Sequence, residues 1–337
     1  MTRGARKWRR FLDVDPVPIL AASHNPAIAF FARRDLLGAK VGPVAALWEL
    51  PPALRIVRKQ CADGSWRYPG GKVHVRSREN YDQLETFRQV GVLVEEFGFT
   101  RQHPAMQRAA EHLFSFQTEE GDFRGIYGSQ YATTYVGAIM ELLIKAGYGG
   151  DSRIAKGFRW LLSVRQNDGG WAIPMRTVGI PFSEFVNTRR HPKPIGPDTS
   201  KPSSHLVTGM VLRAFAAHPL RRRSAAALHA GEWLASRLYE RDAFGDRGDV
   251  GYWERVSFPF WFTDIVSALD TLSRMELPAD APTTRAALER VRKLQRKDGT
   301  FGLRLMKGKD PDLPWWICLA VCRSLARWPA PFRREGE

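Results

Sequence analysis

The chain has 337 residues, of which 44% are hydrophobic, so it can bury a large core. It contains no run near the roughly 18 apolar residues of a membrane-spanning helix, its three cysteines do not suggest a disulfide framework, and no apolar stretch of a secretory signal follows the basic first residues. These exclusions predict a cytoplasmic protein. The chain is strongly basic, with a formal net charge of +16.

The first part of the chain is a basic N-terminal segment over residues 1–25, and the repeating region that follows spans residues 26–330. A poorly defined apolar helix is predicted around residues 26–38. A clearer one covers residues 80–98. Further apolar helices are predicted over residues 131–147, 203–218, 261–275 and 314–328. We call these six the inner helices.

Amphipathic segments alternate with the inner helices, and we call them the outer helices. Their apolar residues recur at steps of three and four, which is typical of a helix with one buried face. One such stripe before Gln117 consists of Met106, Ala110, Leu113 and Phe114. A second, before Gln166, consists of Ile154, Phe158, Leu161 and Leu162, and a third, before Gln295, of Ala287, Val291 and Leu294. The sequence therefore predicts repeated helix pairs.

A short motif joins each outer helix to its inner helix. The chain reads QCADGSW at 60–66, QTEEGDF at 117–123, QNDGGW at 166–171 and QRKDGTF at 295–301. The third copy is one residue shorter, with Gly170 four and Trp171 five positions after Gln166. A decayed copy is expected within residues 237–253. We interpret these Gln–aromatic turns as structural staples, in which Gln bonds backbone groups at a helix end and the ring seals the corner.

Four copies of this motif resemble the repeat of squalene–hopene and oxidosqualene cyclases and of protein prenyltransferase β subunits, over about residues 40–328. The resemblance implies an all-α fold, a single α/α toroid in which about six inner helices surround a central apolar cavity. It also implies an isoprenoid substrate.

The residues that this family uses for chemistry are mostly missing. Class II cyclases carry a DxDD motif at the start of an inner helix, and here only Asp264 stands at the matching place. Asp198 is a second acid candidate, at the end of a Pro-rich connector or lid over residues 172–202. Both are predicted as catalytic acids, with a helix cap as the competing interpretation of Asp264.

Metal chemistry has no motif either, because DDxxD and the prenyltransferase DxC pattern are absent. His205, Asp264 and Cys318 each fall near the start of an inner helix and have side chains that bind zinc, but they lack the family spacing. No motif thus supports magnesium or zinc, and the cofactor stays unknown.

Aromatic residues gather instead at the starts of the inner helices. Such rings can hold a polyene chain and stabilise carbocations by cation–π attraction, although each ring taken alone is as well explained by core packing. The predicted substrate-binding residues are Tyr131, Tyr135, Trp261, Phe262, Trp315, Trp316 and His205.

The basic charge admits several partners. No nucleic-acid motif accompanies it, so peripheral association with an anionic membrane or a diphosphate substrate is favoured over nucleic acid. Three functions follow: an isoprenoid-acting, terpene-cyclase-like enzyme with a divergent site, a non-catalytic toroid that binds a lipid or a protein, and a zinc-dependent prenyltransferase-like enzyme.

Overall fold

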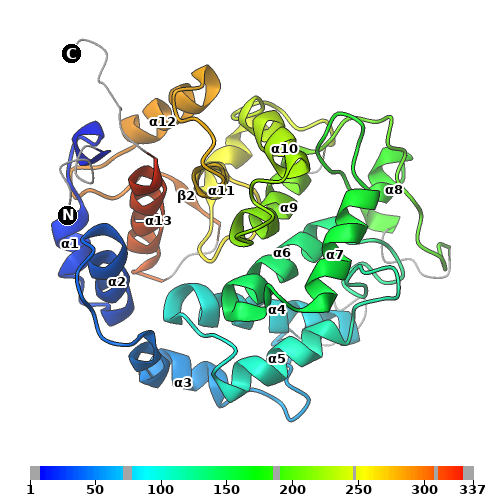
Figure 1. Ribbon diagram of the computed structural model, residues 1–337, viewed down its shortest axis with the longest axis horizontal. Helices are drawn as coiled ribbons and strands as arrows, with labels where there is room; N and C mark the ends of the chain where they lie inside the picture. The colour runs from blue at the N-terminus through cyan, green and yellow to red at the C-terminus, as the bar shows by residue number, and fades with distance from the viewer. Residues whose placement is uncertain (1–7, 71–77, 185–189, 246–247, 307–309, 329–337) are drawn as a thin grey trace. The chain divides into compact units, whose positions relative to one another are not determined.

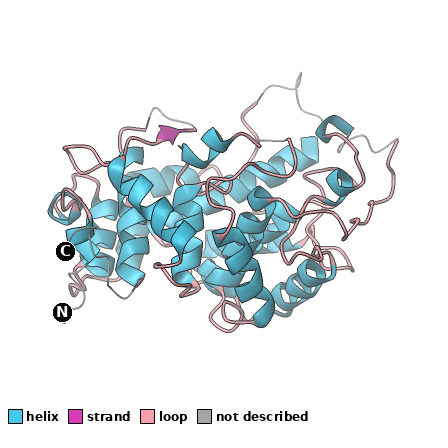
Figure 2. Ribbon diagram, turned by 90° about the horizontal axis from the view of Figure 1, so that it is seen from above, coloured by secondary structure: helices cyan, strands magenta, loops and turns pink. Residues whose placement is uncertain are grey.

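The computed structural model describes residues 8–70, 78–184, 190–245, 248–306 and 310–328, and the regular secondary structure in them is almost entirely helical (Figures 1 and 2). The all-α class is therefore confirmed. The chain divides into two compact units. Unit 1 comprises Met1–Pro43, Gly231–Asp242 and Arg247–Glu337, and unit 2 comprises Val44–Ala230 with Ala243–Asp246. Closure of all the helices into one ring stays a prediction.

Unit 2 holds three of the inner helices: α4 (Arg78–Phe97), α6 (Thr133–Leu143) and α9 (His205–Ala217). Its outer helices are α3 (Pro51–Val57), α5 (Pro104–Phe114) and α7 (Ser152–Ser163), and a single-turn helix α8 (Pro174–Thr177) lies in the connector. Helix α6 is buried at every position, and a π-helical turn (Ile144–Tyr148) follows it. The alternation of outer and inner helices in this unit is thus as predicted.

Unit 1 is built from α1 (Val17–Ala21), α2 (Pro26–Phe31), α11 (Ile265–Arg274), α12 (Pro282–Lys293) and α13 (Leu313–Arg327). Helix α2 continues into a π-helical turn (Ala32–Leu36), and α10 (Ala225–Ala235) contributes residues to both units. The strands described are β1 (Arg255–Val256) and β2 (Arg304–Leu305), which pair in parallel.

Part of the basic N-terminal segment belongs to the core of unit 1. Trp8, Phe11 and Leu12 are buried, and the backbone of Asp13 and Val14 is hydrogen-bonded to the side chain of Gln295. Residues 1–7 of the predicted segment lie outside the described residues. Residues 8–25 therefore contribute to packing.

The buried faces of α5 and α7 consist of the predicted apolar residues, with one exception. Met106, Ala110, Leu113 and Phe114 are all buried in α5. In α7, Ile154, Phe158 and Leu161 are buried, but 36% of Leu162 is exposed. The stripe fails there because α7 buries a face of limited width, and Leu162 follows Leu161 by a rotation of about 100°.

The closest described helix packing in unit 2 joins α6 to α9. A side chain at Gly137 in α6 would place its Cβ 2.6 Å from the Cα of Val211 in α9, a distance that atoms do not reach. A residue without a Cβ is therefore required at position 137. This close approach lets the two inner helices bury one another along their length.

The Gln–aromatic turns link consecutive outer elements. The Gln60 amide donates to Gly64 O (3.0 Å) in its own turn and to Ala105 O (2.8 Å) in the first turn of α5. Gln117 bonds Gly121 O and Arg153 O in the same way. Gln295 bonds Gly299 O and Val14 O. Each of these Gln side chains therefore ties its turn to a neighbouring segment, which confirms that Gln bonds backbone groups.

The turn aromatics are buried at the same corners. Trp66 donates from its indole nitrogen to Ile56 O (2.8 Å), and Trp171 donates to Leu161 O (2.6 Å). The backbone nitrogens of these two tryptophans donate to Thr86 and Thr208 of the following inner helices, at 3.0 and 2.9 Å. Each tryptophan thus joins the end of an outer helix to an inner helix.

In the shorter third copy of the motif, the residues that match the other turns in space differ from those that the sequence predicts. The left-handed glycine is Gly169 (φ 102°) rather than Gly170, and it corresponds to Gly64 in the first turn. Arg165 lies four residues before it, and its Nε donates to Gly169 O (2.6 Å), as the Gln amides do elsewhere. Arg165 therefore occupies the position of the motif Gln, and the spacing to Trp171 is conserved at six residues. The Asp-Gly-x-Trp pattern, aligned without regard to Gln, would have shown this.

Candidate functional site

Three aromatic side chains cluster between the middle of α4 and the start of α6 in unit 2. The ring of Tyr135 in α6 meets Phe87 of α4 edge-on, with centroids 5.8 Å apart, and Tyr127 at 5.7 Å. The Tyr127 hydroxyl lies 3.4 Å from Thr134 Oγ1. All three rings are at least nine-tenths buried. Of this unit 2 aromatic cluster, Tyr135 was predicted as a binding residue, and Phe87 was not.

Unit 1 contains a second aromatic cluster at the start of α13. Trp316 stacks on Phe258 with an interplanar angle of 9° and centroids 5.2 Å apart. Phe31 of α2 lies 6.2 Å from Trp316, and Phe260 lies 5.6 Å from Phe258. Trp316 is 2% exposed, whereas Trp315 is half-buried. We call this set the unit 1 aromatic cluster.

The predicted acid Asp264 is the N-cap of α11. Its carboxylate accepts a hydrogen bond from the backbone nitrogen of Ser267 (2.8 Å), while Ser267 Oγ accepts one from the backbone nitrogen of Asp264 (2.9 Å). This reciprocal capping box satisfies two backbone donors at the helix start. Asp264 is 1% exposed. Its carboxylate is thus engaged in capping the helix, which is the competing interpretation to a catalytic acid.

The second predicted acid, Asp198, lies in the connector on a partly exposed stretch of chain. Its carboxylate accepts hydrogen bonds from the hydroxyl and the backbone nitrogen of Ser200, at 2.5 and 3.1 Å. These hydrogen bonds lower the pKa of Asp198 below its ordinary value of 3.8. A carboxyl group with a lowered pKa is ionised at neutral pH and is a poor proton donor.

The connector is held at several points along its course. Gln166 donates to the carbonyl oxygens of Asp198 (2.8 Å) and Lys201 (2.9 Å). Gln130, which is 1% exposed, donates to His191 O and Lys193 O and accepts from the backbone nitrogen of Ile195. Residues 185–189 of the predicted lid lie outside the described residues. The described part of the connector is therefore anchored by two buried amides.

Tyr131 faces a polar environment. Its hydroxyl donates to a carboxylate oxygen of Glu120, the guanidinium of Arg124 lies 5.0 Å from its ring centroid, and its ring lies 5.3 Å from that of Trp160 in α7. Burial and the Glu120 carboxylate raise the pKa of Tyr131 to about 12. The ring thus packs beside the Gln117 turn, against Arg124 and Trp160.

The remaining predicted binding residues are distributed over both units. His205 is the first residue of α9 and is 5% exposed. Trp261 and Phe262 have ring centroids 6.0 Å apart, and the Trp261 backbone nitrogen donates to Ser257 Oγ. Tyr131, Tyr135, His205 and Asp198 belong to unit 2, and Trp261, Phe262, Asp264, Trp315 and Trp316 to unit 1.

The buried carboxylates share one property that the sequence did not reveal. Within the part of the chain that the structure describes, each of the six has a bonded partner. Five pair with arginine: Asp82 with Arg67, Glu85 with Arg88, Asp122 with Arg124, Glu141 with Arg213 and Asp270 with Arg274 and Arg327. The sixth is the cap Asp264. These five carboxylates are therefore already engaged in charge-assisted hydrogen bonds or ion pairs.

One of these pairs belongs to a cluster of charged side chains that links three inner helices of unit 2. The Arg213 guanidinium of α9 lies 2.9 Å from Glu141 of α6, and both side chains are at most 5% exposed. Lys145 lies 2.7 Å from Glu141 and also pairs with Glu95 of α4. The sequence signal was the presence of two charged residues, Glu141 and Lys145, within the largely apolar residues 131–147.

Metal ligands were also sought among the described residues. No group of three or more His, Cys, Asp or Glu side chains is placed there to hold a metal ion. Cys318 instead donates its thiol to Gly299 O (3.4 Å) at the Gln295 turn. No helix of the described chain is long and apolar enough to cross a bilayer.

The comparisons with known proteins support the predicted family resemblance. Residues 85–177 match the model of the squalene-hopene cyclase C-terminal domain. This segment runs from the middle of α4 to α8 and includes two Gln–aromatic turns. The resemblance of the chain to the squalene–hopene cyclase-like family is thus confirmed. A search of curated proteins found no match.

Solved structures show weaker likenesses. A variant of the type II terpene cyclase MstE from Scytonema, in complex with its substrate geranylgeranyl dihydroxybenzoate, is 14% identical, with a TM-score of 0.34 over 93% of this chain and 98% of that one. A protein from Actinoplanes is 16% identical, with a TM-score of 0.31 over 85% and 99%. A further MstE variant, in complex with its product merosterolic acid A, is 13% identical, with a TM-score of 0.33 over 93% and 97%.

Proposed function

We propose that the protein acts on an apolar polyene or prenyl chain, as a terpene-cyclase-like protein with a divergent active site. The observation that carries the proposal is the unit 2 aromatic cluster, because Phe87, Tyr127 and Tyr135 all fall within the segment that matches the cyclase family model. The rings of Tyr135 and Phe87 are well suited to contact an isoprenoid chain and to attract a cationic centre.

A non-catalytic protein that binds the same ligand is the second candidate. It is favoured by the pairing of all six buried carboxylates among the described residues. Cyclisation that begins by protonation needs a carboxylic acid that stays protonated until it acts, and an arginine partner opposes that state. Asp264, which stands at the start of an inner helix where the family carries its acid motif, is the candidate for the acid.

The test combines binding with turnover. We would titrate the protein with farnesyl diphosphate, geranylgeranyl diphosphate and squalene, follow tryptophan fluorescence, and analyse the products of long incubations with and without magnesium or zinc. Saturable binding with new cyclic or transferred products supports the enzyme. Saturable binding without products supports the non-catalytic candidate.

A matched pair of variants assigns the binding to the aromatic cluster. Tyr135→Leu removes the ring but keeps an apolar side chain, and Tyr148→Leu removes a tyrosine that packs on Phe114 at the outer side of α6. We expect Tyr135→Leu alone to weaken binding. Equal binding by both variants, or no binding of any isoprenoid by the wild type, contradicts the proposal.

A further inference from the structure

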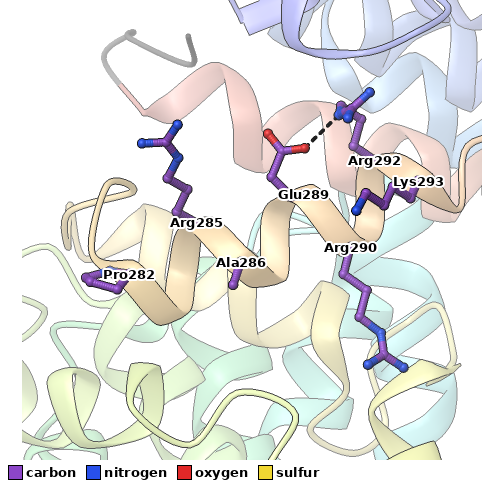
Figure 3. Close-up of a pocket in the computed structure, with 7 residues that line it drawn as sticks. All are labelled: Pro282, Arg285, Ala286, Glu289, Arg290, Arg292 and Lys293. Carbon is purple, nitrogen blue, oxygen red and sulfur yellow. Dashed lines mark hydrogen bonds and ion pairs between the residues drawn. The ribbon is translucent and has the colours of Figure 1, made fainter. Parts of the chain in front are cut away.

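Helix α12 of unit 1 presents a strongly basic face. Its Thr284, Ala287, Leu288 and Val291 are buried, so the opposite side of the helix faces outward. That side contains a groove of about 710 Å³ (Figure 3). The described residues that line it are Pro282, Arg285, Ala286, Glu289, Arg290, Arg292 and Lys293. We call it the α12 groove.

Two of its four cationic side chains are already neutralised by carboxylates. Arg290 pairs with Glu254 at 2.7 Å, and Arg292 pairs with Glu289 at 2.9 Å and with Asp13 at 2.8 Å. Figure 3 shows Glu289 directed toward Arg292. The single carboxylate that lines the groove is thereby occupied.

The other two cations have no such partner. Arg285 and Lys293 are exposed, and neither forms an ion pair with any residue in the described ranges. They lie eight residues apart, about 12 Å along the helix axis. Side chains as long as those of arginine and lysine can converge on one ligand between them. The α12 groove therefore offers two uncommitted positive charges beside two that are held in place.

We propose that the α12 groove binds a phosphate-bearing anion. The two sources of such a group are inorganic diphosphate and the phosphate headgroup of a lipid. Guanidinium and ammonium groups form their strongest hydrogen bonds with phosphate and carboxylate oxygens, and arginine can contact two oxygens at once. A compact ligand fits a groove formed along three turns of one helix. The inference is independent of the isoprenoid function.

The first test uses inorganic pyrophosphate and isothermal titration calorimetry at low salt. Arg285→Gln with Lys293→Gln removes the two uncommitted charges, and we expect affinity to fall about tenfold or more. Arg58→Gln with Lys59→Gln removes two exposed charges at the end of α3 and is the matched control for net charge. Equal weakening in both double variants, or no pyrophosphate binding by the wild type, overturns the proposal.

A second variant should raise the affinity for pyrophosphate instead of lowering it. Among the described lining residues Glu289 is the one carboxylate. Glu289→Gln removes its negative charge, while Arg292 keeps its pair with Asp13, so we expect pyrophosphate to bind a few times more tightly. Glu119→Gln, at a fully exposed acid in the Gln117 turn, makes the same change of net charge. Glu289→Gln binding no more tightly than Glu119→Gln contradicts the assignment. Unfolding temperatures check that every variant is folded.

Vesicles distinguish the two sources of the phosphate. We would measure sedimentation with vesicles of phosphatidylcholine alone and with 30% phosphatidic acid added, a composition chosen for the assay. Binding to the acidic vesicles that falls in the Arg285/Lys293 double variant assigns the groove to a lipid headgroup. Binding of pyrophosphate without such vesicle binding assigns it to a free phosphate. Tighter, groove-dependent binding of duplex DNA than of either probe overturns the proposal.

Discussion

The side-chain amide of Gln117 lies 2.8 Å from the carbonyl oxygen of Arg153, at the start of the next outer helix. The same amide contacts Gly121 O at 3.0 Å within its own turn. One side chain therefore holds a turn and the beginning of a helix 36 residues further along the chain. Gln60 makes the equivalent link to Ala105. The Gln–aromatic turns thus join consecutive repeats as well as sealing each corner.

Replacement of Gln117 should destabilise the fold. Gln117→Ala removes both hydrogen bonds and leaves two partly buried carbonyl oxygens without their donor, so we expect a loss of roughly 1–3 kcal/mol in the free energy of unfolding. Urea denaturation followed by circular dichroism measures it. Gln102→Ala, on an exposed position just before α5, is the control and should change stability by less than about 0.5 kcal/mol. A loss no larger than the control contradicts the stapling role.

Removal of a turn tryptophan should cost more. Trp171→Ala and Trp66→Ala each delete a buried ring and an indole hydrogen bond, and we expect losses of about 3 kcal/mol or more. Trp171→Phe keeps a smaller buried ring and loses the bond to Leu161 O, so its loss should lie between those of the wild type and Trp171→Ala. Thermal unfolding is the measurement. A variant that keeps its melting temperature but loses ligand binding would assign the tryptophan to the site instead.

The position of Arg165 in the third turn can be tested by restoring the motif. Arg165→Gln keeps a donor for Gly169 O, the bond that Gln makes in the other turns, so stability should change by less than about 0.5 kcal/mol. Arg165→Ala removes the donor and should lose about 1 kcal/mol. Equal losses in the two variants would show that the arginine acts through its contact with His229.

The cap role of Asp264 predicts a difference between two substitutions. Asparagine caps helices nearly as well as aspartate, so Asp264→Asn should stay within about 0.5 kcal/mol of the wild type, whereas Asp264→Ala should lose about 1–2 kcal/mol. Once a substrate is found, turnover by the stable Asn variant decides the chemistry. Near-full turnover removes Asp264 as the acid, and loss of turnover with an intact fold supports it.

Acid stability should depend on Arg153. Its hydrogen bonds lower the pKa of Asp151 from an ordinary value of 3.8 and that of Glu111 from 4.5. A carboxyl group with a lowered pKa in the folded state stabilises the protein above its unfolded pKa, and this stability is lost as the pH falls from about 4.5 through the folded values. The melting temperature of Arg153→Gln should therefore fall less between pH 5 and pH 3 than that of the wild type. Arg159→Gln, at an exposed position of α7, is the control and should follow the wild type.

The sequence by itself determined the helix pairs and their turns. The three-and-four spacing of Met106, Ala110 and Leu113 sets which face of α5 is buried, because a helix repeats every 3.6 residues. Gly64, Gly121 and Gly299 mark the turns, because each adopts a left-handed backbone that other residues rarely take. These signals are local, so they can be read without knowledge of the neighbouring helices.

Only the tertiary structure decided what these elements contact. The Asp-Gly-x-Trp spacing aligns Arg165 with Gln60, but the hydrogen bond that gives Arg165 the same role is made to a carbonyl oxygen that only the folded turn places. Glu141 and Lys145 are four residues apart, but their further partners Arg213 and Glu95 come from helices distant in sequence, so no spacing rule connects the whole cluster. The cap at Asp264 likewise became clear only when the backbone of Ser267 was placed beside it. Hydrogen bonds and ion pairs form only when two atoms are placed to within a few tenths of an ångström of the right distance. That placement follows from how the segments pack and not from residue order.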